Sequence, residues 1–357
     1  MSQLPDLKNK RVLLIGGAGF IGHNLALTLK KLNCEVSIVD GLQVNNLLSL
    51  HNSDNQLSEN ELYQTIIQER LELLKKAEIP LFVEDARDYH RLGLLFNKLK
   101  PQVVVQLAAV SHASRSNKNP HDTFDHSFRT LENSLDCSKK EVEHFIYFSS
   151  SMVYGNFETE SVNEETICDP LGIYGALKFG GEKLVIAYNQ VFNLPYTIIR
   201  PSALYGERCI SRRVGQIFIE NALRGNNICI RGDGNEKLDF TYIDDLVQGI
   251  VRIIHDKKAM NQIFNITYGE GKSLNDMAKI ILKEFPNVSL ENITRDNLIP
   301  ERGTLDISKA KNLINYAPEY VLSKGYLKYI NWYKTFFAKN NILTQKQSVN
   351  LGSQINE

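Results

Sequence analysis

A tyrosine and a lysine stand four residues apart in the segment YGALK, at Tyr174 and Lys178. On a helix, residues i and i+4 share a face, so the two side chains would lie together. A phenol with its usual pKa of about 10 is a poor proton acceptor at neutral pH, but an adjacent ammonium group stabilises the phenolate and lowers that pKa. The spacing therefore predicts general acid–base chemistry, with an ordinary pair of surface residues as the alternative.

The segment GGAGFIG follows an apolar run and opens a helical pattern. It matches GxGxxG through Gly17, Gly19 and Gly22, and GxxGxxG from Gly16. Without side chains the backbone can turn tightly and approach a pyrophosphate, and the helix that follows offers free N–H groups to phosphate oxygens. A simple glycine turn at a strand end is the alternative. The loop predicts dinucleotide binding by Gly16, Gly19, Phe20, Ile21 and Gly22.

Asp40 ends the second apolar run, EVSIVD, at the distance from the glycine loop where a carboxylate binds the adenosine ribose. Gly41 follows it, so no arginine stands next to the ribose to receive a 2′-phosphate. This pattern favours NAD over NADP. Asp85 and Ala86 follow the third apolar run and are expected to flank the adenine.

These residues need a framework to position them. Short runs that are rich in β-branched residues and apolar on both faces are typical of buried parallel strands. Segments of helical length separate these runs. The alternation predicts an α/β fold, a Rossmann-type doubly wound parallel sheet, with strands at RVLLIG (11–16), EVSIVD (35–40), PLFVED (80–85), QVVVQLAA (102–109), HFIYFSS (144–150) and YTIIRP (196–201).

The alternation also predicts the domain boundaries. Residues 1–200 are expected to form the NAD-binding domain, with an inserted helical segment at about 45–79. This segment would lie near the adenosine end of the cofactor, but a simple surface elaboration is the favoured alternative. Residues 201–338 are expected to form a smaller, mostly C-terminal α/β lobe that binds substrate. Part of it, at about 238–268, is expected to return to the first domain. Residues 339–357 are rich in Asn, Gln and Ser and predict a flexible tail.

The composition excludes several classes of protein. Lysine plus arginine equals aspartate plus glutamate, 41 each, so no global charge favours nucleic acid or a membrane surface. The five cysteines include no CxxC pair, so we predict neither a disulfide framework nor a metal site. There is no signal-peptide core and no run long enough to span a membrane. We expect a cytoplasmic protein.

The motifs occur in a fixed order along about residues 10–333. The set resembles the extended short-chain dehydrogenase/reductase family, in particular its NAD-dependent nucleotide-sugar epimerase/dehydratase branch, and within it the UDP-hexose 4-epimerases. The resemblance rests on GGAGFIG, Asp40, LAA (107–109), SSSMVYG (149–155), YGALK, RPSALYG (200–206) and GDGNEKLDFTYIDD (232–245).

The resemblance implies roles for individual residues. Tyr174 would be the catalytic acid/base, and Lys178 its partner, which also holds the nicotinamide ribose. Ser150 would be a third catalytic residue that hydrogen-bonds the sugar O4. The chemistry would begin with hydride transfer from a sugar carbon to NAD while Tyr174 takes the hydroxyl proton. Further cofactor contacts are implied for Leu107, Ala108 and Ala109.

The segment SSSMVYG helps to distinguish epimerisation from dehydration and decarboxylation. Family members that eliminate water across C5–C6 resemble STDEVYG here, with an acid and a base at the Asp and Glu positions. In this chain Ser151 and Met152 occupy those positions, and neither can act as a carboxylate base. Dehydration and decarboxylation are therefore disfavoured, whereas 4-epimerisation needs no further base. A serine nucleophile is disfavoured because there is no GxSxG elbow.

The substrate lobe departs from the family pattern. Ala203 replaces the asparagine of RPxNxYG, and Leu238 replaces the arginine of RDF. Both changes remove side chains that often hold the diphosphate. Arg302 stands where the family commonly has a pyrophosphate-binding arginine, whose planar fork suits that anion. The predicted substrate-binding residues are Ser111, His112, Ser151, Met152, Ser202, Arg213 and Arg302, and Arg212, Arg231 or Lys237 could also compensate.

Three functions stay open from the sequence. The first is a nucleotide-sugar epimerase, with C4 inversion of a UDP-sugar through a transient ketone favoured. The second is a nucleotide-sugar dehydrogenase or reductase, with a 5,6-dehydratase or 3,5-epimerase less favoured. The third is an inactive NAD-binding scaffold, against which the triad Ser150, Tyr174 and Lys178 argues. By analogy with the family we expect a homodimer formed through helices at 123–136 and from Ile173 onward, acting on a nucleotide-diphosphate sugar.

Overall fold

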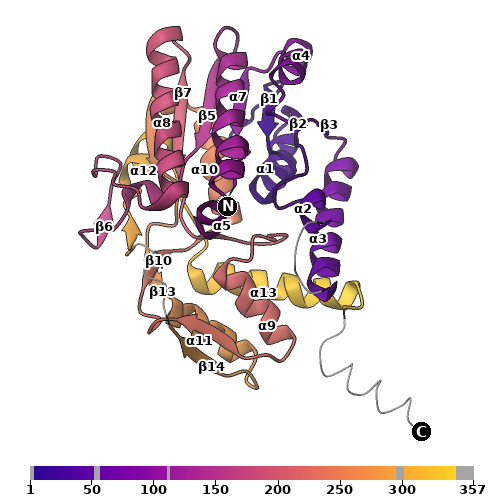
Figure 1. The fold of residues 1–357 in the computed structure, drawn as a ribbon, viewed down its shortest axis with the longest axis vertical. Coiled ribbons are helices and arrows are strands. Elements are labelled where there is room, and N and C mark those ends of the chain that lie inside the picture. Colours follow the sequence, from indigo (N-terminus) through magenta and orange to yellow (C-terminus); the bar gives the residue numbers. More distant parts are fainter. Residues whose placement is uncertain (1–3, 52–56, 111–112, 295–300, 343–357) are drawn as a thin grey trace.

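The computed structural model describes residues 4–51, 57–110, 113–294 and 301–342. At its centre lies a seven-stranded parallel sheet with strand order β12-β7-β5-β4-β1-β2-β3 (Figure 1). The predicted doubly wound α/β sheet is confirmed, and each of the six predicted strands is present. The strands are β1 (Arg11–Ile15), β2 (Glu35–Val39), β3 (Leu81–Phe82), β4 (Val103–Gln106), β5 (His144–Phe148), β7 (Tyr196–Arg200) and β12 (Gln262–Asn265).

The strands are apolar on both faces because each face of the sheet has its own hydrophobic core. Along β1, Val12 and Leu14 belong to one core, and Leu13 and Ile15 belong to the other. Successive side chains of a strand point to opposite faces, so a strand covered on both sides needs a continuous apolar run. Burial on both faces fixes the register of the central strands, and with it the position of the loops that follow them.

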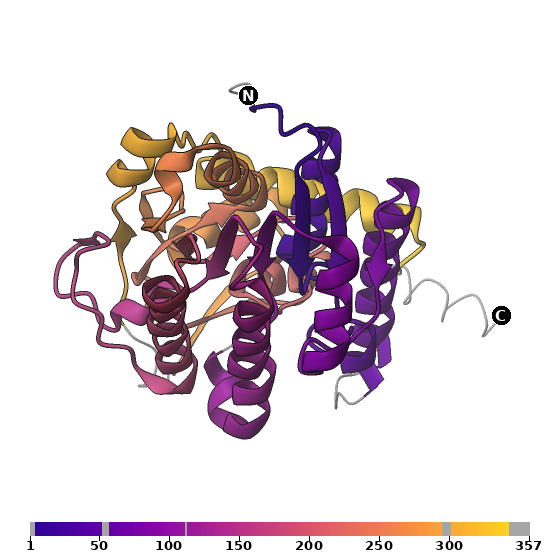
Figure 2. The same ribbon diagram turned by 90° about the horizontal axis from the view of Figure 1, so that it is seen from above.

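Helices cover the two faces of the sheet (Figure 2). The core on one face includes residues of α1 (Phe20–Lys31) and α10 (Ile243–His255). The core on the other includes residues of α4 (Tyr89–Leu99), α7 (Thr130–Ser138) and α8 (Gly172–Phe192). The carboxyl ends of the strands share one edge of the sheet, where open α/β sheets bind their ligands.

The predicted helix at 123–136 is interrupted. It consists of α6 (Pro120–Phe124), the π-helical turn η1 (Asp125–Arg129) and α7, and it follows α5 (Ala113–Lys118). A π-helical turn inserts one residue into the hydrogen-bond ladder and redirects the side chains around it. The interruption lies next to the site described below, where His126 faces a cavity.

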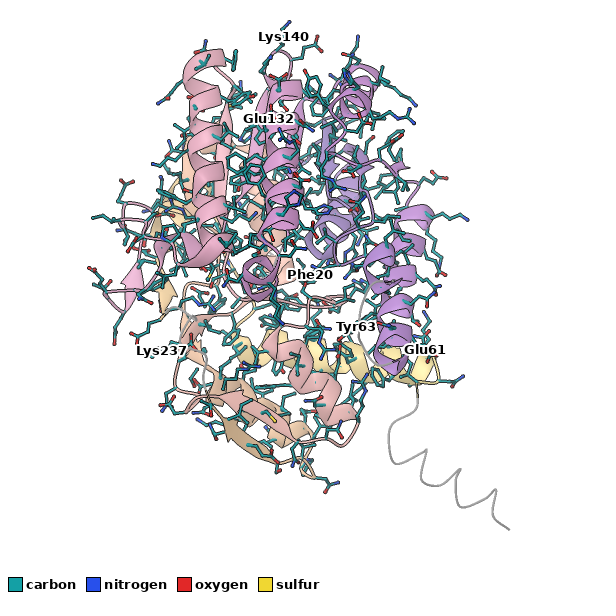
Figure 3. The ribbon with its side chains drawn as sticks, in the orientation of Figure 1. Phe20, Glu61, Tyr63, Glu132, Lys140 and Lys237 are labelled. Atoms are coloured by element: carbon teal, nitrogen blue, oxygen red, sulfur yellow. The ribbon has the colours of Figure 1, made fainter. Side chains whose placement is uncertain are left out.

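The inserted segment after β2 contains α2 (Leu47–His51) and α3 (Leu57–Lys76), as the sequence predicted for a helix in this region. Helix α3 runs from the sheet towards the C-terminal part of the chain (Figure 1). Tyr63, which Figure 3 labels at the lower end of α3, donates a hydrogen bond to Glu220 at 2.9 Å. Tyr333 donates to the other oxygen of the same carboxylate at 2.7 Å. The insertion is therefore tied to the second lobe.

The second lobe lies beyond the carboxyl ends of the strands (Figure 1). Its helices are α9 (Val214–Leu223), α11 (Leu274–Glu284) and α13 (Leu322–Lys339). Helix α13 brings buried aromatic rings against this lobe, among them Tyr326, Tyr329 and Tyr333. Between these elements the chain returns to the first domain, because α10 packs on the sheet and β12 pairs with β7.

Short elements complete the fold. Among the described residues, four two-stranded sheets lie outside the central sheet: β8 (Leu204–Tyr205) with β11 (Thr241–Tyr242), β9 (Ile228–Arg231) with β14 (Leu290–Ile293), β10 (Lys237–Asp239) with β13 (Gly271–Ser273), and β6 (Ser161–Val162) with β15 (Thr304–Leu305). The remaining elements are η2 (Ser151–Tyr154), η3 (Lys257–Ala259) and α12 (Ser308–Ile314). Among the helices described, none combines the length and apolar character needed to cross a membrane.

Candidate functional site

A cavity lies at the carboxyl edge of the sheet, over the glycine loop. Except for Tyr174 and Lys178, every residue predicted to bind the cofactor lines it: Gly16, Gly19, Phe20, Ile21, Gly22, Asp40, Asp85, Ala86, Leu107, Ala108 and Ala109. Gly16 has a φ of +79°, and a Cβ atom there would lie 2.6 Å from the backbone nitrogen of Ala108. Only glycine fits this turn. The loop thus has the close backbone approach that a dinucleotide requires.

Asp40 is held at the end of β2 by two backbone N–H groups. Its Oδ2 accepts from Ala18 at 2.9 Å, and its Oδ1 accepts from Leu42 at 2.8 Å. Burial raises the pKa of the Asp40 carboxyl, and the two N–H groups oppose that rise. Each oxygen keeps a further lone pair, so the carboxylate can accept from both hydroxyls of a ribose.

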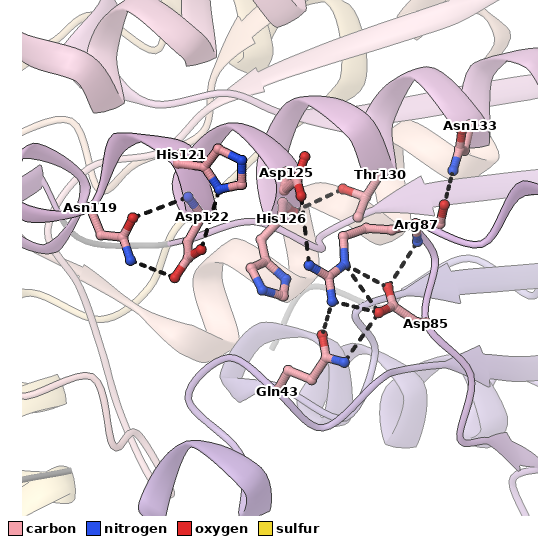
Figure 4. Close-up of polar contacts among 10 residues, drawn as sticks. All are labelled: Gln43, Asp85, Arg87, Asn119, His121, Asp122, Asp125, His126, Thr130 and Asn133. Atoms are coloured by element: carbon pink, nitrogen blue, oxygen red, sulfur yellow. Dashed lines mark hydrogen bonds and ion pairs between the residues drawn. The ribbon is translucent and has the colours of Figure 1, made fainter. Parts of the chain in front are cut away.

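Asp85 belongs to a charged cluster at the far end of the cavity (Figure 4). Arg87 pairs with its carboxylate at 2.7 Å, and the Nε2 of Gln43 donates to it at 3.1 Å. Burial opposes the ionisation of Asp85, but these hydrogen bonds outweigh it and lower the pKa to about 2. Asn133 on α7 donates to the carbonyl oxygens of Ala86 and Arg87. This end of the cavity, where the sequence predicts the adenine, is therefore preorganised by side chains from three segments.

Further cavity residues were not singled out by the sequence as cofactor contacts. They come from the loop after β2, from α3, from the π-helical turn and the first residue of α7, and from the loop before α9. No motif marked them, because each becomes adjacent to the glycine loop only through long-range packing. They are Gln43, Asn45, Arg70, His126, Thr130 and Ser211.

The predicted catalytic residues lie together on α8 and at the end of β5. Lys178 is 7% exposed, its Nζ donates to the carbonyl oxygen of Phe148 at 2.6 Å, and the same nitrogen lies 6.0 Å from the centre of the Tyr174 ring. The Oγ of Ser150 accepts from the backbone nitrogen of Met152 at 3.2 Å. The end of β5 thereby holds the ammonium group near the Tyr174 ring.

Tyr174 lies among groups that act on its ionisation in opposite directions. Burial raises the pKa of the phenol above its usual value and outweighs the positive charges of Arg213 and Arg302 and a hydrogen bond with Ser150, which lower it. Two arginines and a hydroxyl therefore favour the phenolate. These groups oppose, but do not reverse, the rise in the pKa of Tyr174 that burial causes.

A close contact between α8 and β5 fixes this geometry. A Cβ atom at Gly181 would lie 2.2 Å from the hydroxyl oxygen of Tyr147, so glycine allows the helix to approach the strand. The Tyr147 hydroxyl donates to the carbonyl oxygen of Lys178 at 3.4 Å. The packing of α8 on β5 thus fixes the position of Lys178 relative to the end of β5.

The ionisation of Lys178 predicts a pH dependence. Burial lowers its pKa to about 8, and the negative charge of Glu182 opposes that shift. The ammonium group is present below this pH and is lost as the pH rises through it, so kcat is expected to fall on the basic side near pH 8. A pH–kcat profile checks this. Lys178→Arg keeps its charge at high pH and should show no such fall, even at a lower maximum; a native kcat that keeps rising above pH 9 would contradict the assignment.

A second cavity adjoins the first in the C-terminal lobe. Arg213 and Leu204 line both cavities. The second cavity is basic, since its wall includes Arg212, Arg213, Arg231 and Arg302. Ala203 and Leu238, the two departures from the family pattern, also line it. Ala203 has a φ of +29°, in a region that asparagine tolerates better than alanine.

The predicted substrate residues are distributed unevenly. Arg213 and Arg302 line the second cavity. Ser151, Met152 and Ser202 are buried and line neither of the two cavities. Ser111 and His112 lie outside the residues that the structure describes.

The sequence model of the NAD dependent epimerase/dehydratase family matches residues 12–267, which include the glycine loop, Asp40 and the acid–base pair. The chain belongs to this NAD-dependent epimerase/dehydratase family. The predicted cofactor, NAD, is confirmed by this membership, and the glycine cradle and the Asp40 carboxylate fit it.

Named members of the NAD-dependent epimerase/dehydratase family resemble the chain along most of its length. A putative UDP-glucose 4-epimerase of Methanocaldococcus jannaschii is 30% identical over 331 residues, which cover 90% of this chain and 98% of that protein. A UDP-glucuronate 4-epimerase of Thermodesulfobacterium geofontis is 27% identical over 332 residues, 90% of this chain and 95% of that protein. A dTDP-D-glucose 4,6-dehydratase of Dictyostelium discoideum is 29% identical over 307 residues, 79% of this chain and 64% of that protein. The relatives therefore include both epimerases and dehydratases.

Solved structures of named 4-epimerases share the fold. The UDP-glucuronic acid 4-epimerase of Bacillus cereus, in complex with UDP-glucuronic acid and NAD, superposes with a TM-score of 0.80 at 26% identity, covering 91% of this chain and 99% of that one. A mutant of that enzyme bound to UDP-4-deoxy-4-fluoro-glucuronic acid and NAD gives a TM-score of 0.82 with the same identity and coverage.

Proposed function

We propose that the protein is a nucleotide-sugar epimerase that inverts C4 of a UDP-sugar. One observation carries the proposal: Arg213 lines both cavities and lies within electrostatic reach of Tyr174. A dianionic diphosphate in the basic second cavity would therefore place an attached sugar towards the acid–base pair. Two relatives that bind or act on UDP-sugars at C4 support this substrate class.

In the proposed epimerisation the residues of the chain would have the following roles. Tyr174 accepts the proton of the C4 hydroxyl and later returns it, and Ser150 holds the same oxygen by a hydrogen bond. Lys178 keeps its positive charge beneath the phenol and stabilises the phenolate. NAD, when bound, supplies the reversible acceptor for the hydrogen on C4. Epimerisation would then require only that the flat C4 ketone presents its other face before C4 regains its hydride and the oxygen regains its proton.

The segment after Ser150 favours epimerisation over dehydration. Its next residues are Ser151 and Met152, which form the first turn of η2. A 4,6-dehydration also removes a proton and a C6 hydroxyl, and such an elimination needs a further base and acid. Neither a hydroxyl with its ordinary acidity nor a thioether can serve as that base. Glu182 is the acidic residue of α8 nearest to Lys178 in the sequence. It forms an ion pair with Arg200 and accepts a hydrogen bond from Ser149, so both interactions hold its carboxylate away from the role of that base.

The experiment is a substrate screen followed by proton NMR. Purified protein is incubated with UDP-glucose, UDP-glucuronic acid, UDP-N-acetylglucosamine, and GDP-, CDP- and dTDP-linked sugars. An epimerase gives new anomeric signals of the C4 epimer, the same equilibrium mixture from either epimer, and no accumulating absorbance from reduced cofactor. Accumulating reduced cofactor would indicate a dehydrogenase instead, and a new C6 methyl signal would indicate a dehydratase. Either result would overturn the proposal, as would no conversion of any sugar.

A further inference from the structure

Arg70 of the inserted helix α3 is buried at the edge of the cofactor cavity. Its side chain is 1% exposed and lines the cavity that holds the glycine loop. Its Nε donates to the carbonyl oxygen of Arg208 at 2.8 Å, its Nη2 donates to the same oxygen, and its Nη1 donates to the carbonyl oxygen of Asn45 at 3.4 Å. Because a guanidinium group has five N–H donors, these bonds leave one N–H on each terminal nitrogen for another acceptor.

The charge of Arg70 has no close counter-ion among the described residues. Its three printed hydrogen bonds all go to backbone carbonyls, and no described carboxylate lies within ion-pair distance of it. Asp40 is near enough to favour the charged form, whereas Arg208 disfavours it. Burial lowers the pKa of the Arg70 guanidinium to about 10, so the group stays positive at neutral pH. A buried charge without an opposite charge costs several kcal/mol, so the position favours an anion in the adjacent cavity.

The surroundings indicate which part of the cofactor supplies that anion. Arg70 acts electrostatically on His23, which lies on the first turns of α1 and is itself fully buried. The N-terminus of α1 is where the phosphates of a dinucleotide bind in this fold. The ribose side of the cavity is different, because there Asp40 presents a carboxylate that would repel a 2′-phosphate.

We propose that Arg70 is the counter-charge for the diphosphate of the bound dinucleotide, and that it couples cofactor binding to the substrate loop at 206–213. The same guanidinium holds the carbonyl oxygen of Arg208, in a loop that ends at Arg213. Arg208 in turn donates to the Nε2 of His23 at 3.0 Å and pairs with Glu69 of α3 at 3.2 Å. A shift of Arg70 towards the diphosphate would move the loop that lines the substrate cavity. The inference concerns the cofactor and stands independently of which sugar is epimerised.

The test compares dinucleotide binding in matched variants stripped of NAD. Arg70→Gln keeps an amide that can still donate to the Arg208 carbonyl but removes the charge. Arg70→Lys keeps the positive charge and removes the planar guanidinium group with its paired N–H donors. Tyr63→Phe is the control, since it removes the bond from α3 to Glu220 without changing any charge. Calorimetric titration gives the Kd of each variant for NAD⁺, ADP-ribose and NADP⁺.

We expect Arg70→Gln to weaken NAD⁺ and ADP-ribose binding equally, by about ten- to a hundred-fold, as for a lost hydrogen bond to a charged group. Arg70→Lys should recover part of that loss, and Tyr63→Phe should change Kd less than about twofold. The ratio of NAD⁺ to NADP⁺ affinity should not change. The proposal is wrong if Arg70→Gln binds NAD⁺ like the native protein, if it alters NADP⁺ alone, or if Tyr63→Phe is equally weakened. If Arg70→Gln does not fold, Arg70→Lys carries the test: it must bind NAD⁺ and ADP-ribose more weakly than the native protein does, and native affinity for both would overturn the proposal.

Discussion

Replacing Tyr174 by phenylalanine is expected to lower kcat between about a hundred- and ten-thousand-fold, the range in which a positioned acid–base group contributes. The change removes one oxygen atom, which accepts the substrate proton in the proposed mechanism. Lys178 keeps its bond to the Phe148 carbonyl, and the NAD cavity keeps its lining, because the Tyr174 hydroxyl contributes to neither. Steady-state assays on the converted UDP-sugar, together with the amount of NAD that copurifies, measure both effects.

Tyr154→Phe is the matched control for that variant. Tyr154 is buried in η2, close to the catalytic group, and its hydroxyl donates to the Oδ1 of Asn265 at 2.8 Å. Its loss should cost about 1 kcal/mol of stability, as for one hydrogen bond, with kcat changed less than about threefold. If Tyr174→Phe kept native turnover, or if Tyr154→Phe lost as much, Tyr174 would not be the acid–base group.

Much of the fold could be predicted from the sequence because it depends on patterns among residues that are close together in the chain. The six runs that are apolar on both faces can bury all their side chains only as strands covered on both sides. The structure buries the two faces of these strands in two hydrophobic cores. The glycine loop could be recognised because only glycine fits at Gly16, where the backbone of Ala108 lies too close for a Cβ atom. Both signals depend on residues near each other in the chain.

The parts that could not be predicted depend on contacts between distant segments. Arg70 reaches the cofactor cavity only because α3 packs beside the loop that contains Arg208, 138 residues further along the chain. The π-helical turn at 125–129 left no pattern distinguishable from an ordinary helix. The sequence also offered Ser202 as a substrate contact from its motif, whereas the fold buries it away from the two cavities.

The buried ion pair beneath the catalytic helix gives the largest expected change in stability. Glu182 and Arg200 have side chains that are 1% and 3% exposed, with 2.7 Å between Oε2 and Nη2. The Oγ of Ser149 donates to the Oε1 of the same carboxylate at 2.5 Å. Glu182 thus ties α8 to the ends of β5 and β7. Glu182→Leu leaves the guanidinium of Arg200 buried without its counter-charge, and the free energy of unfolding should fall by about 3–5 kcal/mol in urea denaturation.

Two comparisons distinguish this from a simple loss of packing. The double variant Glu182→Leu with Arg200→Met removes both charges, so it should be more stable than Glu182→Leu alone, since an apolar pair can replace a buried ion pair. The control is the exposed pair of Arg129, the last residue of η1, and Glu132 on α7, which Figure 3 labels. Its side chains are 52% and 41% exposed, so Glu132→Leu should change stability by less than about 1 kcal/mol. A double variant as unstable as Glu182→Leu would mean that Glu182 stabilises α8 through its shape and its bond from Ser149 rather than through its charge.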